Sequence, residues 1–483
     1  MITDYFPQLS TFVTSLVAAI HALGVITSVH AVMKTRTSQG AIAWALALIT
    51  LPYLALPLYL IFGRDRFRGY IDARREEGQR IQHLRESMAR RAQDRSSLPK
   101  SAPASYLVFN QLAQMPFTTG NQARLLIDGK ATFEAIFAGI EAATRYVLVQ
   151  FFIVHDDEIG RELKARLLAK ARQGVAIYFL YDEIGCRALP RRYIRELRRG
   201  GIHAEPFKTS RGLSFRFQIN FRNHRKIVVV DGQLAFVGGM NVGDEYLGRS
   251  RRFGPWRDTF ASVSGPAAKA VQLSFLDDWH WSTGEVPDLD WSIDRGGSDG
   301  NGTPVLVLPT GPADDLDSCT LFFAQAIQVA KERVWITSPY FVPNPEILVA
   351  LQLAVLRGVD VRILLPGMPD HLLVYLAAFS YLKDTLPIGV KMYRYKEGFL
   401  HEKAMLVDDQ LAAVGTANLD TRSLRLQFEI SLLFADHSFA AEVKKMLEAD
   451  FARSHPLLMS EIDNRSFAFK VIVRIARLLA PVL

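Results

Sequence analysis

The fold of this chain is decided by two copies of one pattern, NHRKIVVVDG at residues 223–232 and LHEKAMLVDD at residues 400–409, which both read His-x-Lys-x-x-x-x-Asp. Residues two apart in a β-strand point to the same face, so the His and Lys of a copy project together if that copy opens a strand. The apolar residues behind each Lys anchor such a strand in a core. An imidazole beside an ammonium group suits reaction at a phosphate, because a nucleophile or acid then lies next to a fixed positive charge.

Each copy is followed by a second shared pattern, VGGMN at residues 237–241 and VGTAN at residues 414–418. Asn241 and Asn418 therefore follow the two motif histidines at the same distance along the chain. The glycines let backbone approach a ligand closely, and an Asn amide can donate to a phosphate oxygen. One His-x-Lys pair alone would indicate an ordinary surface pair, but two copies with the same continuation predict a shared phosphate-processing site.

This doubled pattern resembles that of the phospholipase D superfamily, in which two such motifs, one from each half of the chain, build a single phosphodiester-processing site. With the apolar N-terminus described below, the chain as a whole resembles the bacterial cardiolipin synthases. The resemblance implies an α/β fold in which two duplicated phospholipase D-like halves form one pseudo-symmetric core, preceded by two N-terminal transmembrane helices. It also implies a phosphatidyltransferase that needs neither a metal nor another cofactor.

In that superfamily one His attacks phosphorus to give a phosphohistidine, and the other protonates the departing alcohol and then activates the acceptor. The resemblance assigns His224 as nucleophile and His401 as acid and base, although the motifs themselves also fit the reverse. The groups that would clamp the phosphate oxygens are Lys226, Lys403, Asn241 and Asn418. The family also provides a carboxylate downstream of each motif to fix the His tautomer. Asp258 and Glu429 match it, with a surface or salt-bridged carboxylate as the alternative.

The last residues of the two motifs, Asp231 and Asp408, complete the predicted catalytic set. Each lies an odd number of positions after its His, so a regular strand turns it to the opposite face. We therefore expect both to hold a turn at the strand end rather than to touch substrate. Weaker candidates, which fall where parallel strands end and could equally cap or pair locally, are Gln150, Asp182, Glu183 and Tyr340.

The composition favours an anionic partner but does not identify it. The chain has 483 residues, a net charge of +8 and 49% hydrophobic residues. Such a charge suits nucleic acid or anionic lipid equally. The two cysteines, Cys186 and Cys319, form no Cys-x-x-Cys or Cys/His cluster, so the sequence predicts neither a zinc site nor a disulfide framework.

The N-terminus contains two uncharged apolar runs, at residues 9–33 and 41–62, each about long enough to cross a bilayer as a helix. We expect two transmembrane helices within residues 1–63, the second kinked at Pro52 and Pro57, and hence a multi-pass protein of the bacterial inner membrane. A cleaved signal peptide is the alternative for the first run, but Asp4 occupies the region where positive charge is needed. Arginine is denser after the second run than between the two, which favours a cytoplasmic catalytic core.

The rest of the chain divides by composition. Residues 64–106 form a basic linker, which is either a solvated connector or a collar that gathers anionic headgroups. Residues 107–290 and 303–460 are the two predicted halves, with a loop rich in Asp, Gly, Ser and Pro at 286–311. Residues 465–483 carry basic and apolar residues at helical spacing, which fits an ordinary packing helix or an amphipathic helix on a membrane surface.

The two halves repeat one order of elements. In the first half the predicted strands are 146–152, 175–182 and 202–207, and the predicted helices are 158–172 and 190–199. In the second the strands are 334–341, 359–365 and 390–395, and the helices are 345–356 and 371–382. Alternating strands and helices predict open sheets covered by helices. Gly174 and Gly358 mark equivalent helix ends.

Four reactions fit the motifs to different degrees. Cardiolipin synthesis uses one phosphatidylglycerol as donor and a second as acceptor, and membrane helices directly before a two-motif core favour it. A phospholipase D or another phosphatidyltransferase shares the intermediate but uses a different acceptor. A membrane-tethered nuclease would also explain the basic charge, but we expect a nuclease to have a soluble or secreted core, which two membrane spans disfavour, so we expect no nucleic-acid partner. A non-enzymatic scaffold conflicts with two intact motifs. Oligomeric state stays open, a homo-oligomer included.

Overall fold

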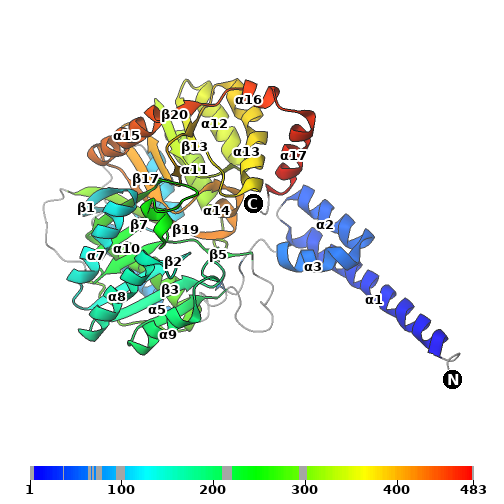
Figure 1. Ribbon diagram of the computed structural model, residues 1–483, viewed down its shortest axis with the longest axis horizontal. Coiled ribbons are helices and arrows are strands. Elements are labelled where there is room, and N and C mark those ends of the chain that lie inside the picture. The colour runs from blue at the N-terminus through cyan, green and yellow to red at the C-terminus, as the bar shows by residue number, and fades with distance from the viewer. Residues whose placement is uncertain are drawn as a thin grey trace. The chain divides into compact units, whose positions relative to one another are not determined.

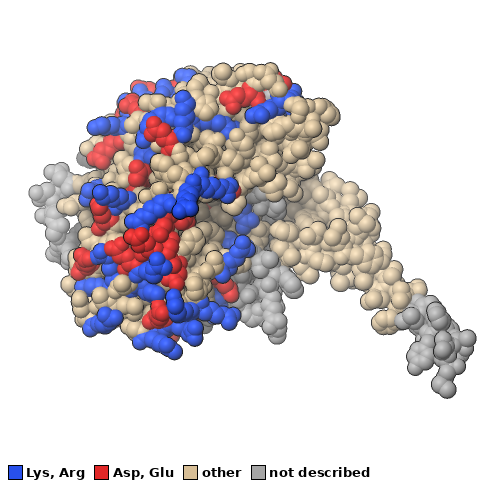
Figure 2. All heavy atoms as spheres, in the orientation of Figure 1, with Lys and Arg blue, Asp and Glu red and all other residues tan. Residues whose placement is uncertain are grey.

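The computed structural model describes residues 5–35, 37–63, 67, 70–71, 79–93, 104–208, 220–292 and 302–480. They form two compact units, residues 1–71 with 209–221, and residues 72–208 with 222–483. Figure 1 shows the helices of the first unit and the mixed helices and strands of the second. In the space-filling view the helices of the first unit are almost bare of charge, whereas the second unit carries interspersed Lys, Arg, Asp and Glu (Figure 2).

The described helices of the N-terminal unit include α1 (Tyr5–Lys34), α2 (Ser38–Thr50) and α3 (Pro52–Phe62). Thr11–Lys34 is long and apolar enough to cross a membrane. The helix expected over residues 41–62, kinked at its prolines, is instead two helices, because the first ends at Thr50 and the second begins at Pro52, whose ring disfavours the helical conformation of Leu51. A Cβ on Gly24 would lie 2.3 Å from the Leu48 carbonyl oxygen, so α1 and α2 pack at backbone contact.

The second unit is built on one 16-stranded sheet, ordered β20-β14-β13-β11-β16-β17-β19-β10-β1-β9-β7-β6-β2-β3-β4, with β5 paired to β19 off this path. Counted outward from the central β10–β1 pair, corresponding strands of the two halves follow in the same order: β19, β17, β16, β11, β13 and β14 on one side, and β9, β7, β6, β2, β3 and β4 on the other. The edge strand β20 lies beyond β14. That pair is antiparallel and joins Thr118 to Val305. The predicted duplication is therefore a continuous sheet with a pseudo-dyad at its centre.

The first half contains β1 (Thr118–Ile127), α7 (Asp128–Ala142), β2 (Tyr146–Phe151), α8 (Glu158–Arg172), β3 (Ala176–Asp182), α9 (Arg191–Arg199), β4 (His203–Phe207), β5 (Arg222–Asn223), β6 (Ile227–Val230), β7 (Leu234–Gly238), β8 (Trp256–Arg257), β9 (Thr259–Ser264) and α10 (Pro266–Thr283). The predicted strands and helices of this half agree with the structure to within one residue at each end. Gly174 has φ of 88° and Gly358 has φ of 86°, the left-handed conformation expected of glycine after a helix.

The second half contains β10 (Thr303–Thr310), α11 (Ser318–Val329), β11 (Arg333–Thr337), β12 (Phe341–Val342), α12 (Pro345–Leu356), β13 (Asp360–Pro366), α13 (Leu372–Thr385), β14 (Lys391–Tyr395), β15 (Phe399–Leu400), β16 (Ala404–Val407), β17 (Leu411–Gly415), β18 (Leu419–Asp420), α14 (Thr421–Arg425), β19 (Gln427–Phe434) and α15 (His437–Ala452). Two predictions were wrong here. The strand expected over 334–341 ends at Thr337, because the Ser338–Pro339 turn separates β11 from β12. The loop expected over 286–311, of which residues 293–301 lie outside the described residues, ends at β10, whose residues pair with both β1 and β19.

The remaining elements are α5 (Gln79–Gln93), α6 (Leu107–Ala113), β20 (Ser454–Pro456), α16 (Ser460–Asp463) and α17 (Phe467–Leu478). About half of the predicted linker, residues 64–106, lies outside the described residues. α5 lies in that segment, and Arg85 on α5 forms an ion pair of 2.5 Å with Asp277. α17 packs beside α13 (Figure 1) and buries Val473 and Ala476.

Two short parallel strand pairs connect the halves away from the central pair. β5 of the first half pairs with β19 of the second, with Asn223 opposite Phe428. β15 of the second half pairs with β8 of the first, with Leu400 opposite Arg257. Each motif is therefore held alongside the segment of the other half that carries a candidate carboxylate.

Candidate active site

The two motif histidines lie in matching positions between the halves. The backbone N–H of His224 donates to the Phe428 carbonyl oxygen at 2.9 Å, and that of His401 donates to the Arg257 carbonyl oxygen at 2.8 Å. The sequence predicted that each motif opens a strand, but the structure differs. β6 and β16 begin one residue after the motif Lys, so His and Lys occupy the approach to the strand.

Each histidine is held by a carboxylate from the other half. His224 Nδ1 lies 3.0 Å from both Oε1 and Oε2 of Glu429, and His401 Nδ1 lies 2.7 Å from Oδ2 of Asp258. Both carboxylates are fully buried. Because an ionised carboxylate only accepts hydrogen bonds, His224 carries its proton on Nδ1 and presents the lone pair of Nε2. Lys403 Nζ lies 2.9 Å from His401 Nδ1, but the contact to Asp258 is shorter, and we assign His401 the same tautomer on that ground. Sequence reasoning found these carboxylates but not the exchange between halves.

The residue that follows Gly238 or Gly415 lies against the carboxylate that holds a motif histidine, and its size matches that carboxylate. Thr416 Oγ1 donates to Glu429 Oε2 at 2.6 Å, a contact that the sequence analysis missed. At the equivalent position of the first half is Gly239, where a Cβ would lie 2.1 Å from Asp258 Oδ1. The first half therefore needs glycine beside the shorter carboxylate, and the second half has a hydroxyl donor beside the longer one.

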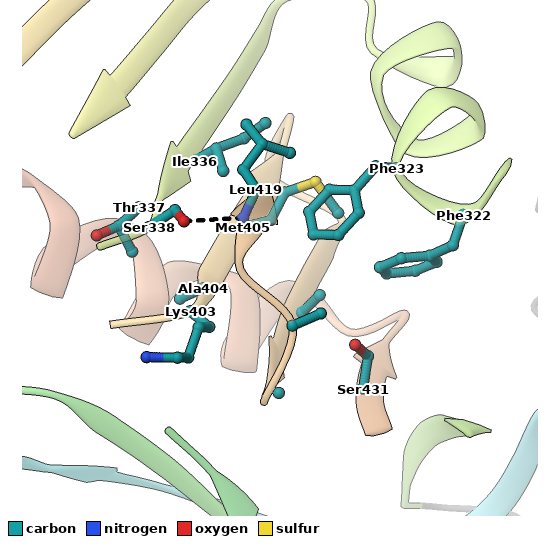
Figure 3. A pocket seen from close by; sticks show the side chains of 13 residues that line it. Phe322, Phe323, Ile336, Thr337, Ser338, Lys403, Ala404, Met405, Leu419 and Ser431 are labelled. Atoms are coloured by element: carbon teal, nitrogen blue, oxygen red, sulfur yellow. Dashed lines mark hydrogen bonds between the residues drawn. The ribbon is translucent and has the colours of Figure 1, made fainter. Parts of the chain in front are cut away.

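Both motif lysines fold back on their histidines. Lys226 Nζ donates to the His224 carbonyl oxygen at 2.7 Å, and Lys403 Nζ donates to that of His401 at 2.5 Å. Figure 3 shows Lys403 at the edge of an apolar pocket, with its ammonium group directed away from the rings of α11. Phe323 and Met405 line the opposite side. The apolar lining keeps water from the buried stem of this lysine.

The two asparagines differ. Asn241 Oδ1 accepts from the Ile153 N–H at 3.1 Å, and its Nδ2 donates to the Tyr246 hydroxyl at 2.8 Å. Asn418 is 4% exposed, and its Oδ1 has no hydrogen-bond partner among the described residues. Asn241 therefore positions surrounding groups, including a tyrosine whose ring centroid lies 6.2 Å from that of His401.

Burial controls the protonation of this site. It lowers the pKa of His224 to about 4, against the opposing charge of Glu429. Burial and then the charge of Lys403 lower the pKa of His401 well below its usual value. Burial likewise lowers the pKa of Lys403 to about 8 and that of Lys226 well below its usual range. Both imidazoles are therefore neutral near pH 7, and an entering phosphate anion would raise the pKa of both lysines.

Asp231 and Asp408 lie at the far ends of their strands, as expected from the strand alternation. Asp231 accepts from the backbone N–H groups of Thr144, Arg145 and Tyr146, each at 2.8 Å. Asp408 accepts in the same way from three successive N–H groups, at residues 331–333. Both residues adopt positive φ, 51° and 52°. They hold the turn before β2 and β11, so the geometry removes them from the predicted catalytic set.

We expect Asp231→Asn to lower the stability of the fold far more than the chemistry of the folded fraction. The amide cannot accept from all three N–H groups as a carboxylate does, and a lost charge-assisted bond costs about 1.5–3 kcal/mol. The thermal midpoint should fall by several degrees while activity per folded molecule stays within about threefold. Asp408→Asn is the matched variant. Loss of activity at unchanged thermal midpoint would contradict the structural role.

The weaker sequence candidates divide into two kinds. Gln150 Nε2 donates to Asn223 Oδ1 at 2.8 Å, and Asp182 Oδ2 accepts from the Asn223 N–H at 2.9 Å, so both position the residue before His224. Glu183 is exposed and makes no such contact. The Tyr340 hydroxyl donates to Asp370 Oδ2 at 2.5 Å, in a pocket considered below.

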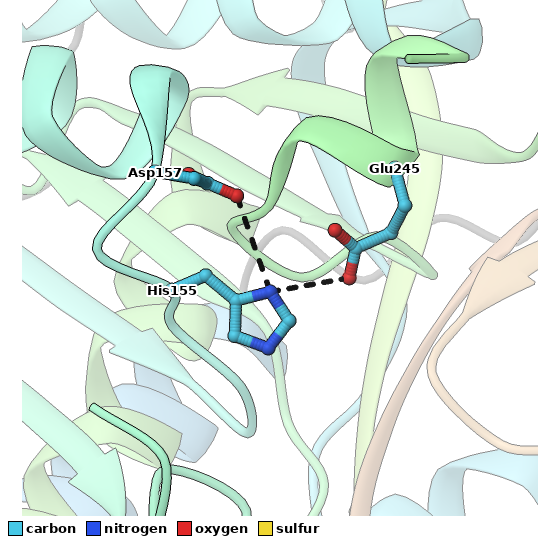
Figure 4. Close-up of side chains that lie close together, drawn as sticks. All are labelled: His155, Asp157 and Glu245. Carbon is cyan, nitrogen blue, oxygen red and sulfur yellow. Dashed lines mark ion pairs between the residues drawn. The ribbon is translucent and has the colours of Figure 1, made fainter. Parts of the chain in front are cut away.

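Among the described residues, one group of three His, Asp or Glu side chains could hold a metal ion: His155, Asp157 and Glu245 (Figure 4). His155 Nδ1 lies 3.4 Å from Glu245 Oε1 and 4.0 Å from Asp157 Oδ2. Both Asp157 oxygens already accept a hydrogen bond, from the N–H groups of Gly160 and Asp244, which takes about half of the lone-pair sites of this carboxylate. We interpret the cluster as an ion pair in which Glu245 raises the pKa of His155.

Comparison with known proteins identifies the family. The family model described as "Cardiolipin synthase, PLD-like domain" matches residues 136–252 and 323–451, one segment in each half. The model described as "Phospholipase_D-nuclease N-terminal" matches residues 17–64. "Cardiolipin synthase A" of Pseudomonas fluorescens is 48% identical over 99% of this chain and 100% of its own length. The chain belongs to the cardiolipin synthase family. It is thus a phosphatidyltransferase of the phospholipase D superfamily, and it acts on phospholipid.

A second cardiolipin synthase agrees with this assignment, and one solved structure shares the fold. "Cardiolipin synthase A" of Pseudomonas entomophila is 48% identical over 97% of this chain and 98% of its own length. The crystal structure of a phosphatidylserine synthase from Haemophilus influenzae covers 79% of this chain and 100% of its own, with a TM-score of 0.58 at 15% identity. At that identity the likeness extends to the fold alone. The prediction of a cardiolipin synthase from the doubled motif is confirmed.

Proposed function

We propose that this chain joins two molecules of phosphatidylglycerol into cardiolipin and glycerol, through a phosphohistidine at His224. The observation that carries the proposal is the crossed pairing of each motif histidine with a buried carboxylate of the other half. Such a pairing gives two imidazoles with free Nε2 atoms and fixed tautomers, and one phosphate between them can be attacked by one and protonated by the other.

In the first step Nε2 of His224 attacks the phosphorus of the donor lipid, and the bond from phosphorus to the glycerol oxygen breaks. The departing alkoxide takes a proton from Nε2 of His401, which the entering phosphate anion has made basic enough to carry it. Lys226 and Lys403 neutralise the charge that gathers on the non-bridging oxygens. The Glu429 carboxylate stabilises the positive charge that develops on the His224 ring.

In the second step a hydroxyl of the acceptor lipid attacks the same phosphorus. Its proton passes to Nε2 of His401, the phosphorus–nitrogen bond breaks, and His224 returns to its neutral state. The two histidines are only 7% and 8% exposed, which supports transfer to an alcohol over hydrolysis because water has little access to the intermediate. A phospholipase D reaction remains the second candidate, and it differs only in using water as acceptor.

We propose a membrane location that follows from the N-terminal unit. α1 would cross the inner membrane once, and α2 with α3 would return as a kinked second span. His21 and His30 within α1 lie 3.2 and 2.9 Å from the hydroxyls of Tyr53 and Tyr59 on α3, so polar side chains are paired inside the hairpin. The catalytic core would lie in the cytoplasm, because arginine is denser after the second apolar run than between the two.

The C-terminal helix α17 fits the same arrangement as a surface contact. It buries Val473 and Ala476 and leaves large apolar side chains exposed, with Phe467 82% and Leu478 78% exposed. Lys470, Arg474 and Arg477 add positive charge. We propose that this face of α17 lies on anionic lipid, since the helix both packs on the core and keeps an unpaired apolar face.

The test is to incubate the purified full chain in detergent with phosphatidylglycerol alone, with and without a chelator, and to identify products by mass spectrometry. We expect cardiolipin and glycerol at the same rate in both. Phosphatidic acid as the main product would replace the proposal with the phospholipase reaction. Loss of activity in chelator, restored by a divalent cation, would contradict chemistry carried by the two motifs without a metal.

A further inference from the structure

A buried arginine lies in a pocket at the carboxyl end of the second-half strands. Arg394 on β14 is 6% exposed, and its guanidinium lies 4.6 Å from the ring centroid of Tyr375 and 4.9 Å from that of Phe379. Its Nε has no hydrogen-bond partner, and the guanidinium makes no ion pair with any residue that the structure describes. Buried arginines are ordinarily paired, so a positive charge kept here without a carboxylate indicates an anionic ligand.

The walls of the pocket suit an anion joined to a polyol. Arg394 lines it together with Tyr340, Asp370 and His371. His371 precedes the first turn of α13, so the positive end of that helix dipole meets the same pocket. Asp370 forms no ion pair with Arg394 and instead accepts from Tyr340 at 2.5 Å. The pocket thus offers the Arg394 guanidinium to an anion. At a separate place it offers the Asp370 carboxylate and the Tyr340 phenol to hydroxyl groups.

The pocket adjoins the catalytic centre. Phe341 in its wall pairs with Leu419, the residue after Asn418, and the Leu419 N–H donates to Ser338 Oγ at 2.9 Å. Burial is the main cause that lowers the pKa of His401, and the negative charge of Asp370 opposes it. Asp370 therefore lies within electrostatic reach of the proposed acid and base.

At the equivalent register position the first half has no arginine. In the second half Arg394 is the register partner of Leu365 on β13. Tyr181 on β3 of the first half corresponds to Leu365 on β13. The register partner of Tyr181 is Pro206 on β4. Proline has no charged group, so the two halves offer different surroundings to the two lipids. A reaction that uses one lipid as donor and another as acceptor needs such a difference.

We propose that the Arg394 pocket binds the phosphodiester of the acceptor phosphatidylglycerol, with the attacking headgroup hydroxyl between Asp370 and His401. The inference rests on the proposed function. Cardiolipin contains two phosphodiesters joined by one glycerol, so its formation requires a place for a second phosphate beside the reacting one. When the hydroxyl oxygen bonds to phosphorus, the bond to His224 breaks and the hydroxyl proton passes to His401.

The rim of the pocket fits the remainder of a lipid. Leu372 and Leu373 at the start of α13 are 64% and 48% exposed, and Met368 before them is 38% exposed. Exposed apolar side chains grouped at one edge indicate contact with apolar material. The acyl chains of an acceptor whose phosphate reaches Arg394 would extend over this edge.

The test compares two acceptors in the full-length enzyme. One assay measures cardiolipin formation from phosphatidylglycerol, and the other measures exchange of labelled free glycerol into phosphatidylglycerol, which uses the same donor and intermediate but an acceptor without phosphate. We expect Arg394→Met to lower the ratio of cardiolipin formation to exchange about 10- to 100-fold, the effect of one lost charge-assisted contact. Arg394→Lys should lower this ratio less, because it keeps the charge but not the planar fork.

Arg362→Met is the matched control, because Arg362 also stacks on an aromatic ring, 4.5 Å from the Trp335 centroid, but has Asp360 as a partner at 2.7 Å. The ratio should not change in this variant.

Equal loss of both reactions in Arg394→Met and Arg394→Lys would assign Arg394 to general support of the site. An unchanged ratio with weaker inhibition by inorganic phosphate would assign the pocket to free phosphate. Should Arg394→Met fail to fold, the Lys variant decides. A wild type that exchanges glycerol but makes no cardiolipin would contradict the proposed function instead.

Discussion

His401→Ala should still form a covalent phosphatidyl-enzyme from a donor with a good leaving group, whereas His224→Ala should form none. With phosphatidyl-p-nitrophenol the departing phenolate needs no proton, so the first step proceeds without the acid. Attack on phosphorus still requires Nε2 of His224, whose Nδ1 is held 3.0 Å from Glu429. With phosphatidylglycerol itself both variants should be inactive, His401→Ala by about 10²–10⁴-fold. Intact-protein mass spectrometry detects the adduct.

The same experiment decides which histidine is the nucleophile, a choice that the motifs leave open. An adduct on His224→Ala and none on His401→Ala would reverse the assignment without changing the overall reaction. Absence of an adduct on both, with nitrophenol still released, would indicate direct displacement by the acceptor. Asp231→Asn serves as control, because its carboxylate bonds the turn before β2 and lies outside the chemistry.

The parts of this structure that follow from local patterns could be predicted from the sequence. The strand–helix alternation and the glycines after helices depend on residues a few positions apart. The turn-holding role of Asp231 could be predicted in the same way, because strand alternation alone turns its side chain away from that of His224. The break at Leu51 was only partly visible: Pro52 predicted a kink, but the structure separates two helices there.

The parts that depend on distant pairing could not be predicted. His224 meets Glu429 because β5 pairs with β19, and no spacing along the chain records which half each carboxylate will serve. Arg394 reads as one more basic residue in an alternating strand. Only the packing of α13 over β14 buries it and leaves it without a carboxylate. Sequence patterns thus identify the reacting groups, while the environment that distinguishes donor from acceptor arises in the folded state.

Glu429→Gln and Asp258→Asn should each lower turnover by about 10²–10⁴-fold, and they should do so at different steps. An amide of the same shape has no negative charge with which to stabilise an imidazolium, and its NH2 group can donate to Nδ1 and so select the wrong tautomer. Glu429 holds the nucleophile, so Glu429→Gln should slow the burst of nitrophenol from the activated donor. Asp258 holds the acid and base, so Asp258→Asn should leave that burst and slow the transfer that follows. Stopped-flow absorbance separates the two phases.

Thr416→Val provides a graded control for the first of these, because it removes one donor to Glu429 and keeps the carboxylate. We expect a loss of about tenfold, confined to the burst.

The transfer step should depend on pH, because burial raises the pKa of Asp258 to about 6. Below that pH the protonated Asp258 no longer accepts from His401, so transfer should fall as pH drops through 6, and this limb should vanish in Asp258→Asn. A slower burst in Asp258→Asn, with a normal burst in Glu429→Gln, would show that each carboxylate serves the step assigned to the other.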